Sequence, residues 1–238
     1  MGWLGTGSIG ISSSGIPLYM EEEKRSRGER LRRFILSQIE KRGSIPFSQF
    51  MEWCLYHPEY GYYRLERASI GRDGDFYTSP CVHPLFGGLI ARQLSQMSRQ
   101  IGGSTFDVVE QGGGRGFLCE DVLQWAKENA SVFYQRLRYH LIETSPFFLK
   151  EQKERLVVYE KEGKLFWMDP EVFEKGKNLM EGCFLSNELV DAFPVHQVIF
   201  DHGNLKEIYV TQNQGRLNEQ WGEPSDPRIA SYCSFNRP

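Results

Sequence analysis

Residues 106–118 read Phe-Asp-Val-Val-Glu-Gln-Gly-Gly-Gly-Arg-Gly-Phe-Leu. The apolar run at 106–109 is typical of a buried strand, and a glycine-rich turn and an amphipathic segment follow it. Glycine has no Cβ, so a ligand can approach the backbone of such a turn closely. A strand, a glycine turn and a helix in this order predict an open α/β sheet with a nucleotide site at the carboxyl ends of its strands.

The spacing of the glycines narrows the class of ligand. A dinucleotide-binding turn needs a glycine where this chain has Phe117, and the Gly-Lys-Ser/Thr of a P-loop does not follow. The remaining pattern, Glu-x-Gly-x-Gly-x-Gly, is formed by Glu110, Gly112, Gly114 and Gly116. It resembles the first motif of the S-adenosylmethionine-dependent methyltransferases, whose glycine loop passes beside the methionine part of the cofactor. A tight glycine turn without a ligand is the alternative.

A second apolar run, at 139–142, ends in the carboxylate of Glu143. Thr144 or Ser145 can cap a helix that Pro146 opens. In a doubly wound sheet, an acid at the end of the second strand accepts hydrogen bonds from a ribose diol, because a carboxylate only accepts and both hydroxyls can donate. We therefore expect Glu143 to bind a ribose, and a solvated strand end is the alternative.

A third run, at 183–195, reads Cys-Phe-Leu-Ser-Asn-Glu-Leu-Val-Asp-Ala-Phe-Pro-Val. Its first residues are strand-like, and Asn187, Glu188 and Asp191 then gather polar groups at the carboxyl end, where ligands of open α/β sheets bind. The Asn-Glu-Leu-Val-Asp-Ala-Phe-Pro-Val run resembles the signature of the MidA-type methyltransferases. That family includes bacterial proteins and a mitochondrial arginine methyltransferase that assists the assembly of respiratory complex I.

Blocks in the N-terminal half resemble the same family, at 56–63, 71–80 and 84–87, so that the resemblance runs from about residue 30 to about residue 230. The family usually has a glutamate where this chain has Cys81, which puts any role of that acid in doubt. The aromatic segment 57–80 is expected to form a lid over the cofactor or a wall of the acceptor pocket, because loops on a scaffold often carry function. A packed surface loop is the alternative.

The resemblance implies a Rossmann-like class I methyltransferase sheet with an N-terminal helical extension and an inserted β-hairpin. It also implies S-adenosylmethionine as cofactor and a protein arginine as acceptor, since a pair of carboxylates can orient a guanidinium group. Trp167 is expected near the adenine ring, and Asp169 is either an adenine ligand or a helix cap. Glu188 and Asp191 could instead be helix N-terminal acids. The expected cofactor residues are Glu110, Gly112, Gly114, Gly116, Glu143, Asp169, Gly74 and Asp75, and the expected catalytic residues are Asn187, Glu188 and Asp191.

Three segments are expected along the chain. Residues 1–21 form a disordered leader, 22–104 an N-terminal helical and lid region, and 105–238 the methyltransferase core with a β-hairpin at about 195–211. The N-terminal helices are expected over 22–41, which Gly43 ends, and near 47–55 and 83–101. Members of the family continue well beyond residue 238, so the core is expected to lack its last strands.

The composition fits a globular enzyme and excludes several other classes. The net charge of −3 implies no broad nucleic-acid surface. The five cysteines include no Cys-x-x-Cys pair and have no metal-binding spacing with histidine, so reduced thiols and no metal are expected. No apolar stretch is long enough to span a membrane. The expected location is the cytoplasm, or the mitochondrial matrix in a eukaryote.

The expected partners follow from the resemblance as well. They are a protein substrate, with a respiratory-complex subunit as the named candidate, and a second copy of the chain through an exposed sheet. Two other functions stay open, namely a non-catalytic cofactor-binding assembly factor or inactive truncated homologue, and a nicotinamide oxidoreductase, against which Phe117 argues.

Overall fold

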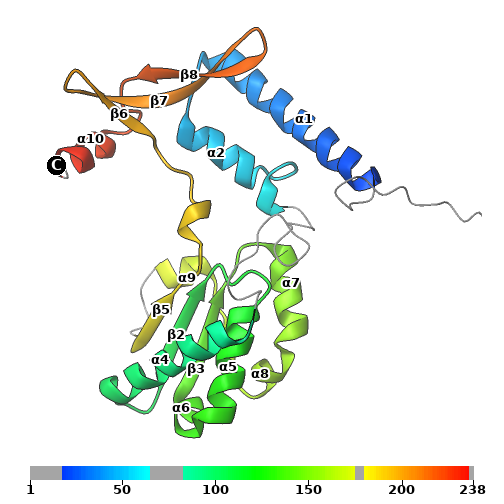
Figure 1. The fold of residues 1–238 in the computed structure, drawn as a ribbon, viewed down its shortest axis with the longest axis vertical. Coiled ribbons are helices and arrows are strands. Elements are labelled where there is room, and N and C mark those ends of the chain that lie inside the picture. Colours follow the sequence, from blue (N-terminus) through cyan, green and yellow to red (C-terminus); the bar gives the residue numbers. More distant parts are fainter. Residues whose placement is uncertain (1–17, 65–82, 175–179, 236–238) are drawn as a thin grey trace, which may run out of the picture. The chain divides into compact units, whose positions relative to one another are not determined.

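The computed structural model describes residues 18–64, 83–174 and 180–235. It divides the chain into two compact units (Figure 1). One unit is Leu65–Phe193, and the other joins Met1–Arg64 to Pro194–Pro238. Gly74, Asp75 and Cys81 lie outside the described residues, as does the part of the expected lid that follows Arg64.

The unit Leu65–Phe193 is built on a parallel sheet in the order β4-β3-β2-β5. The register places Val108 beside Tyr139 on one side and Cys183 on the other. This confirms the expected α/β fold, and the three apolar runs predicted as strands are all in this sheet. Its strands are β2 (Phe106–Gln111), β3 (Leu137–Ile142), β4 (Leu165–Trp167) and β5 (Gly182–Leu185).

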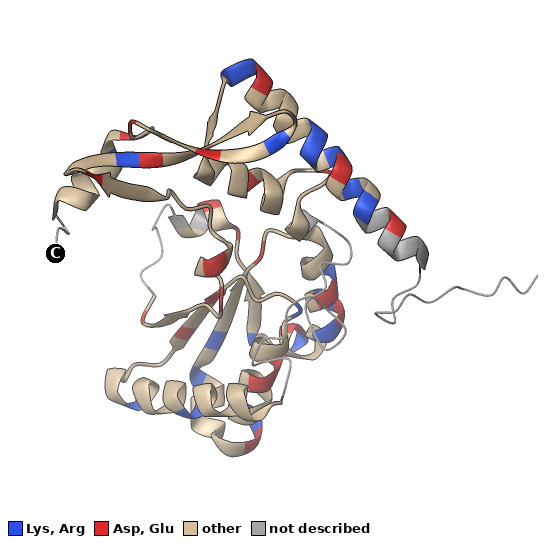
Figure 2. Cartoon of the chain, turned by 45° about the horizontal axis from the view of Figure 1, so that its top comes forward, with Lys and Arg blue, Asp and Glu red and all other residues tan. Residues whose placement is uncertain are grey.

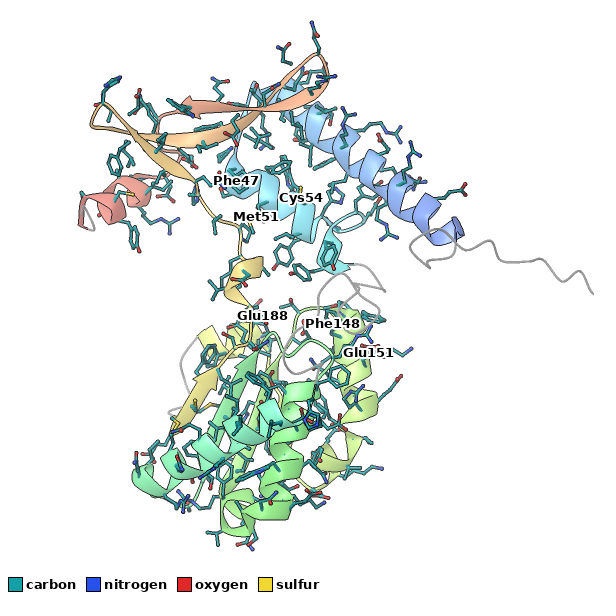
Figure 3. The ribbon with its side chains drawn as sticks, viewed as in Figure 1. Phe47, Met51, Cys54, Phe148, Glu151 and Glu188 are labelled. Atoms are coloured by element: carbon teal, nitrogen blue, oxygen red, sulfur yellow. The ribbon has the colours of Figure 1, made fainter. Side chains whose placement is uncertain are left out.

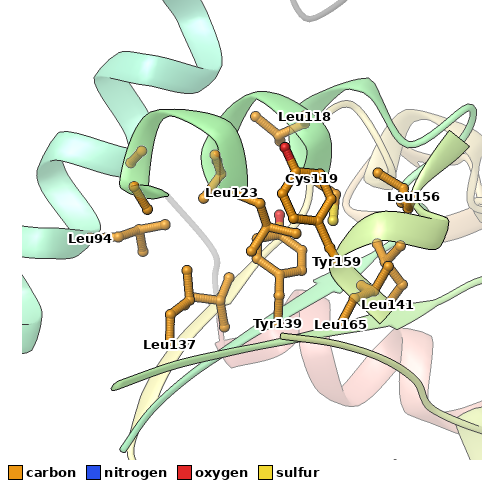
Figure 4. Close-up of a cluster of buried hydrophobic side chains, with 14 of the residues drawn as sticks. Leu94, Leu118, Cys119, Leu123, Leu137, Tyr139, Leu141, Leu156, Tyr159 and Leu165 are labelled. Atoms are coloured by element: carbon orange, nitrogen blue, oxygen red, sulfur yellow. The ribbon is translucent and has the colours of Figure 1, made fainter. Parts of the chain in front are cut away.

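Helices cover one face of this sheet. Alternate strand residues such as Phe106 and Tyr139 are fully buried there against Leu94 and Leu123 (Figure 4). The helices that contribute to this core include α4 (Leu85–Ile101), α5 (Phe117–Asn129) and α6 (Ser131–Arg136). The remaining helical elements of the unit are α7 (Pro146–Arg155), α8 (Val157–Lys161), α9 (Pro170–Glu174) and the 3-10 turn η2 (Val190–Ala192).

The other unit has an antiparallel sheet. Strand β7 pairs with β1, β6 and β8, and Ile45, Val210 and two isoleucines of α1 form its core. Helix α1 carries cations and acids along its outer surface (Figure 2) and ends where Gly43, at φ +81°, donates to the Ile39 carbonyl. The elements are α1 (Leu18–Arg42), β1 (Ile45–Pro46), α2 (Phe47–Tyr56), η1 (Tyr62–Arg64), β6 (Val198–Asp201), β7 (Asn204–Asn213), β8 (Arg216–Gly222) and α10 (Pro227–Phe235).

The expected hairpin is present as β6 and β7. His202 and Gly203 connect the strands, both with positive φ, which is the backbone of a type I′ turn. Gln214 and Gly215 form a second turn of this kind between β7 and β8. The right-handed twist of the strands favours this turn type, so the turn residues account for the three-stranded meander.

The observed division differs from the expected segments in three places. The hairpin lies outside the parallel core, because β7 pairs with β1 in the register Ile45 with Val210. Helix α4 was expected in the N-terminal region, but Ala91 and Leu94 pack in the core of the parallel sheet. Residues 18–21 were expected in the leader and are helical, as the start of α1.

Candidate functional site

The predicted site residues gather where the parallel strands end. Strand β2 leads into the glycine loop (residues 112–116), β3 into Glu143, and β5 into Asn187 and Glu188. All of them belong to the unit Leu65–Phe193, and Figure 3 marks Glu188 at this end of the sheet. The carboxyl ends of parallel strands lie at one edge, which is where open α/β sheets bind ligands.

The glycine loop has a conformation that other residues rarely adopt. The φ angles of Gly112, Gly114 and Gly116 are +72°, +54° and +81°. A Cβ on Gly112 would lie 2.7 Å from Leu189 Cδ1, so a side chain there would push the Leu189 side chain aside. A Cβ on Gly114 would have no atom within 4 Å. The loop is therefore packed against protein at one glycine and borders open space at another.

Glu143 holds the loop through backbone hydrogen bonds. Its Oε2 accepts from the Gly114 amide at 3.2 Å, and its Oε1 accepts from the Thr144 and Ser145 amides at 2.8 Å each. Burial raises the pKa of the Glu143 carboxyl, and these three bonds lower it in part. Ser145, with Pro146 after it, is the cap of α7, because its Oγ accepts from the Phe148 amide at 3.5 Å.

Gln152 was missed by the sequence analysis. Its side chain is fully buried, its Nε2 donates to the Gly114 carbonyl at 2.8 Å, and its Oε1 accepts from Trp167 Nε1 at 3.2 Å. The available signal was its spacing: Phe148, Gln152 and Leu156 are four residues apart, so a polar side chain occupies the buried stripe of α7.

Glu110 faces the core. It is 2% exposed, and its Oε2 accepts from the Tyr139 hydroxyl at 2.7 Å. Burial raises its pKa to about 7, with the Tyr139 bond lowering it and the nearby Glu143 raising it. A Cβ on Gly113 would lie 3.5 Å from Glu110 Cδ, so the carboxyl lies close to the loop on its protein side. The carboxyl therefore lies beneath the loop, and its contact with a cofactor stays a prediction.

Asp169 serves as a cap in this structure. Its Oδ1 accepts from the Glu171 amide at 2.8 Å, and its carbonyl accepts from Phe173 at 3.1 Å, so it begins α9 just before Pro170. This is the alternative that the sequence left open. The capping hydrogen bond is made through Oδ1 and does not use Oδ2.

The segment after β5 presents two of the expected catalytic acids to solvent. Glu188 and Asp191 are exposed, and Asn187 is half-buried. Glu188 has φ +55°, a left-handed conformation that costs a non-glycine residue about 1–3 kcal/mol and is most frequent at functional sites. Asp191 lies in η2, a 3-10 turn of three residues, which is too short to supply much of a helix dipole. The helix-cap alternative therefore explains neither acid well.

Among the described residues, no cluster of three or more His, Cys, Asp or Glu side chains is arranged to hold a metal ion. Within the same ranges, no helix combines the length and the apolar character that crossing a bilayer requires.

Comparison with known proteins agrees with this geometry. A family model described as "Putative S-adenosyl-L-methionine-dependent methyltransferase" matches residues 89–237. The mitochondrial protein arginine methyltransferase NDUFAF7 homologue of Drosophila melanogaster is 33% identical over 207 residues, which cover 78% of this chain and 44% of the relative. The human protein arginine methyltransferase NDUFAF7, also mitochondrial, is 28% identical over 75% of this chain and 44% of its own length.

A solved structure extends the likeness to three dimensions. A protein from Burkholderia thailandensis, described as a "likely methyl transferase" and bound to S-adenosyl-homocysteine, superposes with a TM-score of 0.72 at 26% identity. This match covers 89% of the chain and 54% of that protein. The chain spans about half the length of the relatives that it matches. Given the extent of these matches, the chain belongs to the family of S-adenosyl-L-methionine-dependent methyltransferases.

Proposed function

We propose that the chain binds S-adenosylmethionine at the carboxyl ends of the parallel strands and is the cofactor-binding part of a protein arginine methyltransferase. The observation that carries the proposal is Gly114, a left-handed residue beside open space whose amide is fixed by Glu143. A solved relative with the same fold holds S-adenosyl-homocysteine, and curated relatives are protein arginine methyltransferases.

We assign a separate part of the cofactor to each group of site residues. We assign the methionine part to the glycine loop and the ribose to Glu143. A carboxylate has about four acceptor positions, and backbone amides use three of those on Glu143, which leaves one on Oε2 for a ribose hydroxyl. We assign the adenine to the end of β4, beside Trp167 and the second oxygen of Asp169. Gly74 and Asp75 remain expected contacts.

Glu188 and Asp191 are the proposed acceptor-binding acids, with Asn187 beside them. The sulfonium cofactor would supply an activated methyl group, and the protein would supply orientation and electrostatics. Glu188 and Asp191 would hold the guanidinium nitrogen toward that methyl group, and the nitrogen would lose a proton when it is methylated. Two exposed carboxylates can orient that cation by charge-assisted hydrogen bonds.

Single-turnover methylation of an arginine-containing protein tests the whole proposal. Asp191→Asn and Glu188→Gln keep size and remove charge, so each should slow transfer roughly ten- to a hundredfold, the effect of losing a charge-assisted hydrogen bond, with unchanged cofactor affinity. Unchanged transfer in both variants would remove these acids from the acceptor site. Methylation of a lysine, a small molecule or RNA would discard the arginine acceptor and keep the methyltransferase.

A second candidate is a cofactor-binding assembly factor without turnover. The loop held by Glu143 and the open space at Gly114 would bind the cofactor equally well without turnover. Labelled S-adenosylmethionine incubated with a subunit extract separates the two: label in protein supports the enzyme, and binding without label supports the assembly factor.

The proposed partner and location are based on the same curated relatives, which are mitochondrial proteins. We propose a protein substrate such as a respiratory-complex subunit, and the mitochondrial matrix in a eukaryote or the cytoplasm in a bacterium. A homodimer stays a prediction, which sedimentation of the 238-residue chain would test.

A further inference from the structure

We infer that Gln152 is a positioning residue that joins the glycine loop to Trp167, so that one side chain orients both the loop assigned to the methionine part of the cofactor and the ring assigned to its adenine. The inference rests on the proposed cofactor site. Its basis is a pair of hydrogen bonds: the Gln152 side-chain amide donates to the Gly114 carbonyl, and it accepts from Trp167 Nε1.

The chemistry of the two partners fixes the orientation of the amide. A backbone carbonyl can only accept a hydrogen bond, and an indole N–H can only donate one. The Gln152 NH₂ must therefore face Gly114, and its oxygen must face Trp167. The side chain is fully buried, so no solvent replaces a partner that moves away, and a buried polar group without a partner is costly. The loop and the indole are thus held together.

The glycine loop packs on this side chain and on two neighbouring leucines. A Cβ on Gly116 would lie 3.1 Å from Leu156 Cδ1 and 3.3 Å from Gln152 Cγ, and one on Gly113 would lie 2.8 Å from Leu141 Cδ2 and 3.5 Å from Gln152 Nε2. The Gly114 amide is held by Glu143, and its carbonyl by Gln152. Both peptide groups beside the residue that borders open space are therefore fixed in orientation.

The rest of α7 adds weaker, more exposed contacts. Arg155 Nε donates to the Arg115 carbonyl at 3.1 Å, and the Arg115 and Glu151 side chains form an ion pair at 3.5 Å. Lys153 Nζ lies 5.8 Å from the centre of the Trp167 ring. A surface ion pair contributes only about 0–1 kcal/mol, so Gln152 is the contact of α7 expected to set the loop and the ring.

The experiment is calorimetric titration of the 238-residue chain with S-adenosyl-homocysteine and with adenosine. Gln152→Leu keeps the size and removes both hydrogen bonds, so affinity for both ligands should fall roughly tenfold or more. Trp167→Phe removes the indole donor and also part of the ring, so only the part of its loss that comes from the hydrogen bond should overlap with the loss in Gln152→Leu, which the double variant measures. Gln124→Leu is a control for the loss of a glutamine hydrogen bond away from the site: Gln124, on α5, is exposed and accepts from the Tyr159 hydroxyl at 2.8 Å, so the variant should bind with wild-type affinity.

A charge variant separates positioning from simple loss of packing. In Gln152→Glu, an ionised carboxylate faces the Gly114 carbonyl and cannot donate, whereas the protonated acid can donate there and still accept from Trp167. Relative to wild type, its affinity should be low at alkaline pH and recover as the pH falls. The ratio to wild type cancels the titration of Glu110 and Glu143, which both proteins share.

Three outcomes decide between the ideas. If wild type binds neither ligand, the proposed cofactor site fails. If wild type binds and Gln152→Leu binds equally well, the inference about Gln152 is overturned while the site stands. If Gln152→Leu and Gln152→Glu weaken binding equally at every pH, the effect is loss of packing, and the positioning role is wrong.

Discussion

Asp107 and Glu110 lie three residues apart on β2, and both are almost completely buried, yet they lie on opposite faces of the parallel sheet and have different kinds of partner. Asp107 forms an ion pair with Arg138 at 2.6 Å and a hydrogen bond with His140 Nε2 at 2.7 Å. Glu110 has a phenol, Tyr139, among apolar side chains. A buried carboxyl is stable when it pairs with a cation or keeps its proton. Asp107 pairs with a cation, and Glu110, among apolar side chains, is the one that keeps its proton more readily.

The other side chains on the two faces also differ in how deeply they are buried. The face of Glu110 also carries Phe106, packed in the helix-covered core. The face of Asp107 carries Phe166 and Phe184, which are 40% and 51% exposed, and Phe173 of α9 stacks on Phe184 at 5.5 Å between ring centres. One face therefore supplies most of the packing energy, and the other is held by an ion-pair cluster and by partly exposed rings.

The largest expected contrast is in packing. Phe106→Ala should lower the free energy of unfolding by about 3–5 kcal/mol, because it opens a cavity in a fully buried core. Phe184→Ala, on the other face, should cost less than about 1 kcal/mol, since half of that ring is already in water. Urea unfolding measures both, and equal losses would contradict the contrast between the faces.

The pH dependence of stability tests the charge state of Glu110. Its folded pKa is raised to about 7, so between pH 4.5 and 7 the folded protein keeps a proton that the unfolded chain has released. The free energy of unfolding should therefore fall as the pH rises through this range, by about 3 kcal/mol from this group.

Glu110→Gln is the matched variant for that prediction. Its amide oxygen can still accept from Tyr139, but it does not titrate. Urea unfolding at pH 5 and pH 8 should show a smaller difference in the variant than in wild type. If the two proteins lose equal stability between these pH values, the carboxyl is ionised in the fold and its assignment is wrong.

The smallest of the three effects is expected at Asp107. Asp107→Asn keeps the shape and removes the negative charge that pairs with Arg138 and bonds to His140, which should lower the free energy of unfolding by about 2 kcal/mol. The Arg138 side chain is 44% exposed, so solvent limits the loss. Arg138→Met in the same background measures the coupling: a double variant no worse than Asp107→Asn supports the ion pair, and full additivity contradicts it.

The sequence predicted the strands of the parallel sheet better than the division of the chain into two units. Three apolar runs that end in polar residues predicted β2, β3 and β5, because buried parallel strands are continuous in hydrophobicity. The β6–β7 hairpin was predicted from alternation around the turn at 202–204. Its partner β1 has only two residues, Ile45 and Pro46, which is too short for any pattern, so the membership of the hairpin in the other unit could not be foreseen.

Among the site residues, sequence reasoning found positions better than roles. Glu143 and the glycine loop come together as predicted. Glu110 fits the motif but faces the core, because it is an even number of residues from Phe106 and so shares its face. Gln152 belongs to no sequence motif. It stands out only through its contacts with Gly114 and Trp167, which are distant from it in the sequence.

The most direct test of the central claim is calorimetric titration of Gly114→Val and Gly163→Val with S-adenosyl-homocysteine. Both glycines have positive φ, at +54° and +66°, and a Cβ on either would have no atom within 4 Å, so the two substitutions impose similar strain. Only Gly114 borders the proposed site. Loss of binding in Gly114→Val with wild-type affinity in Gly163→Val is the predicted result, and equal affinity in the two folded variants would contradict it.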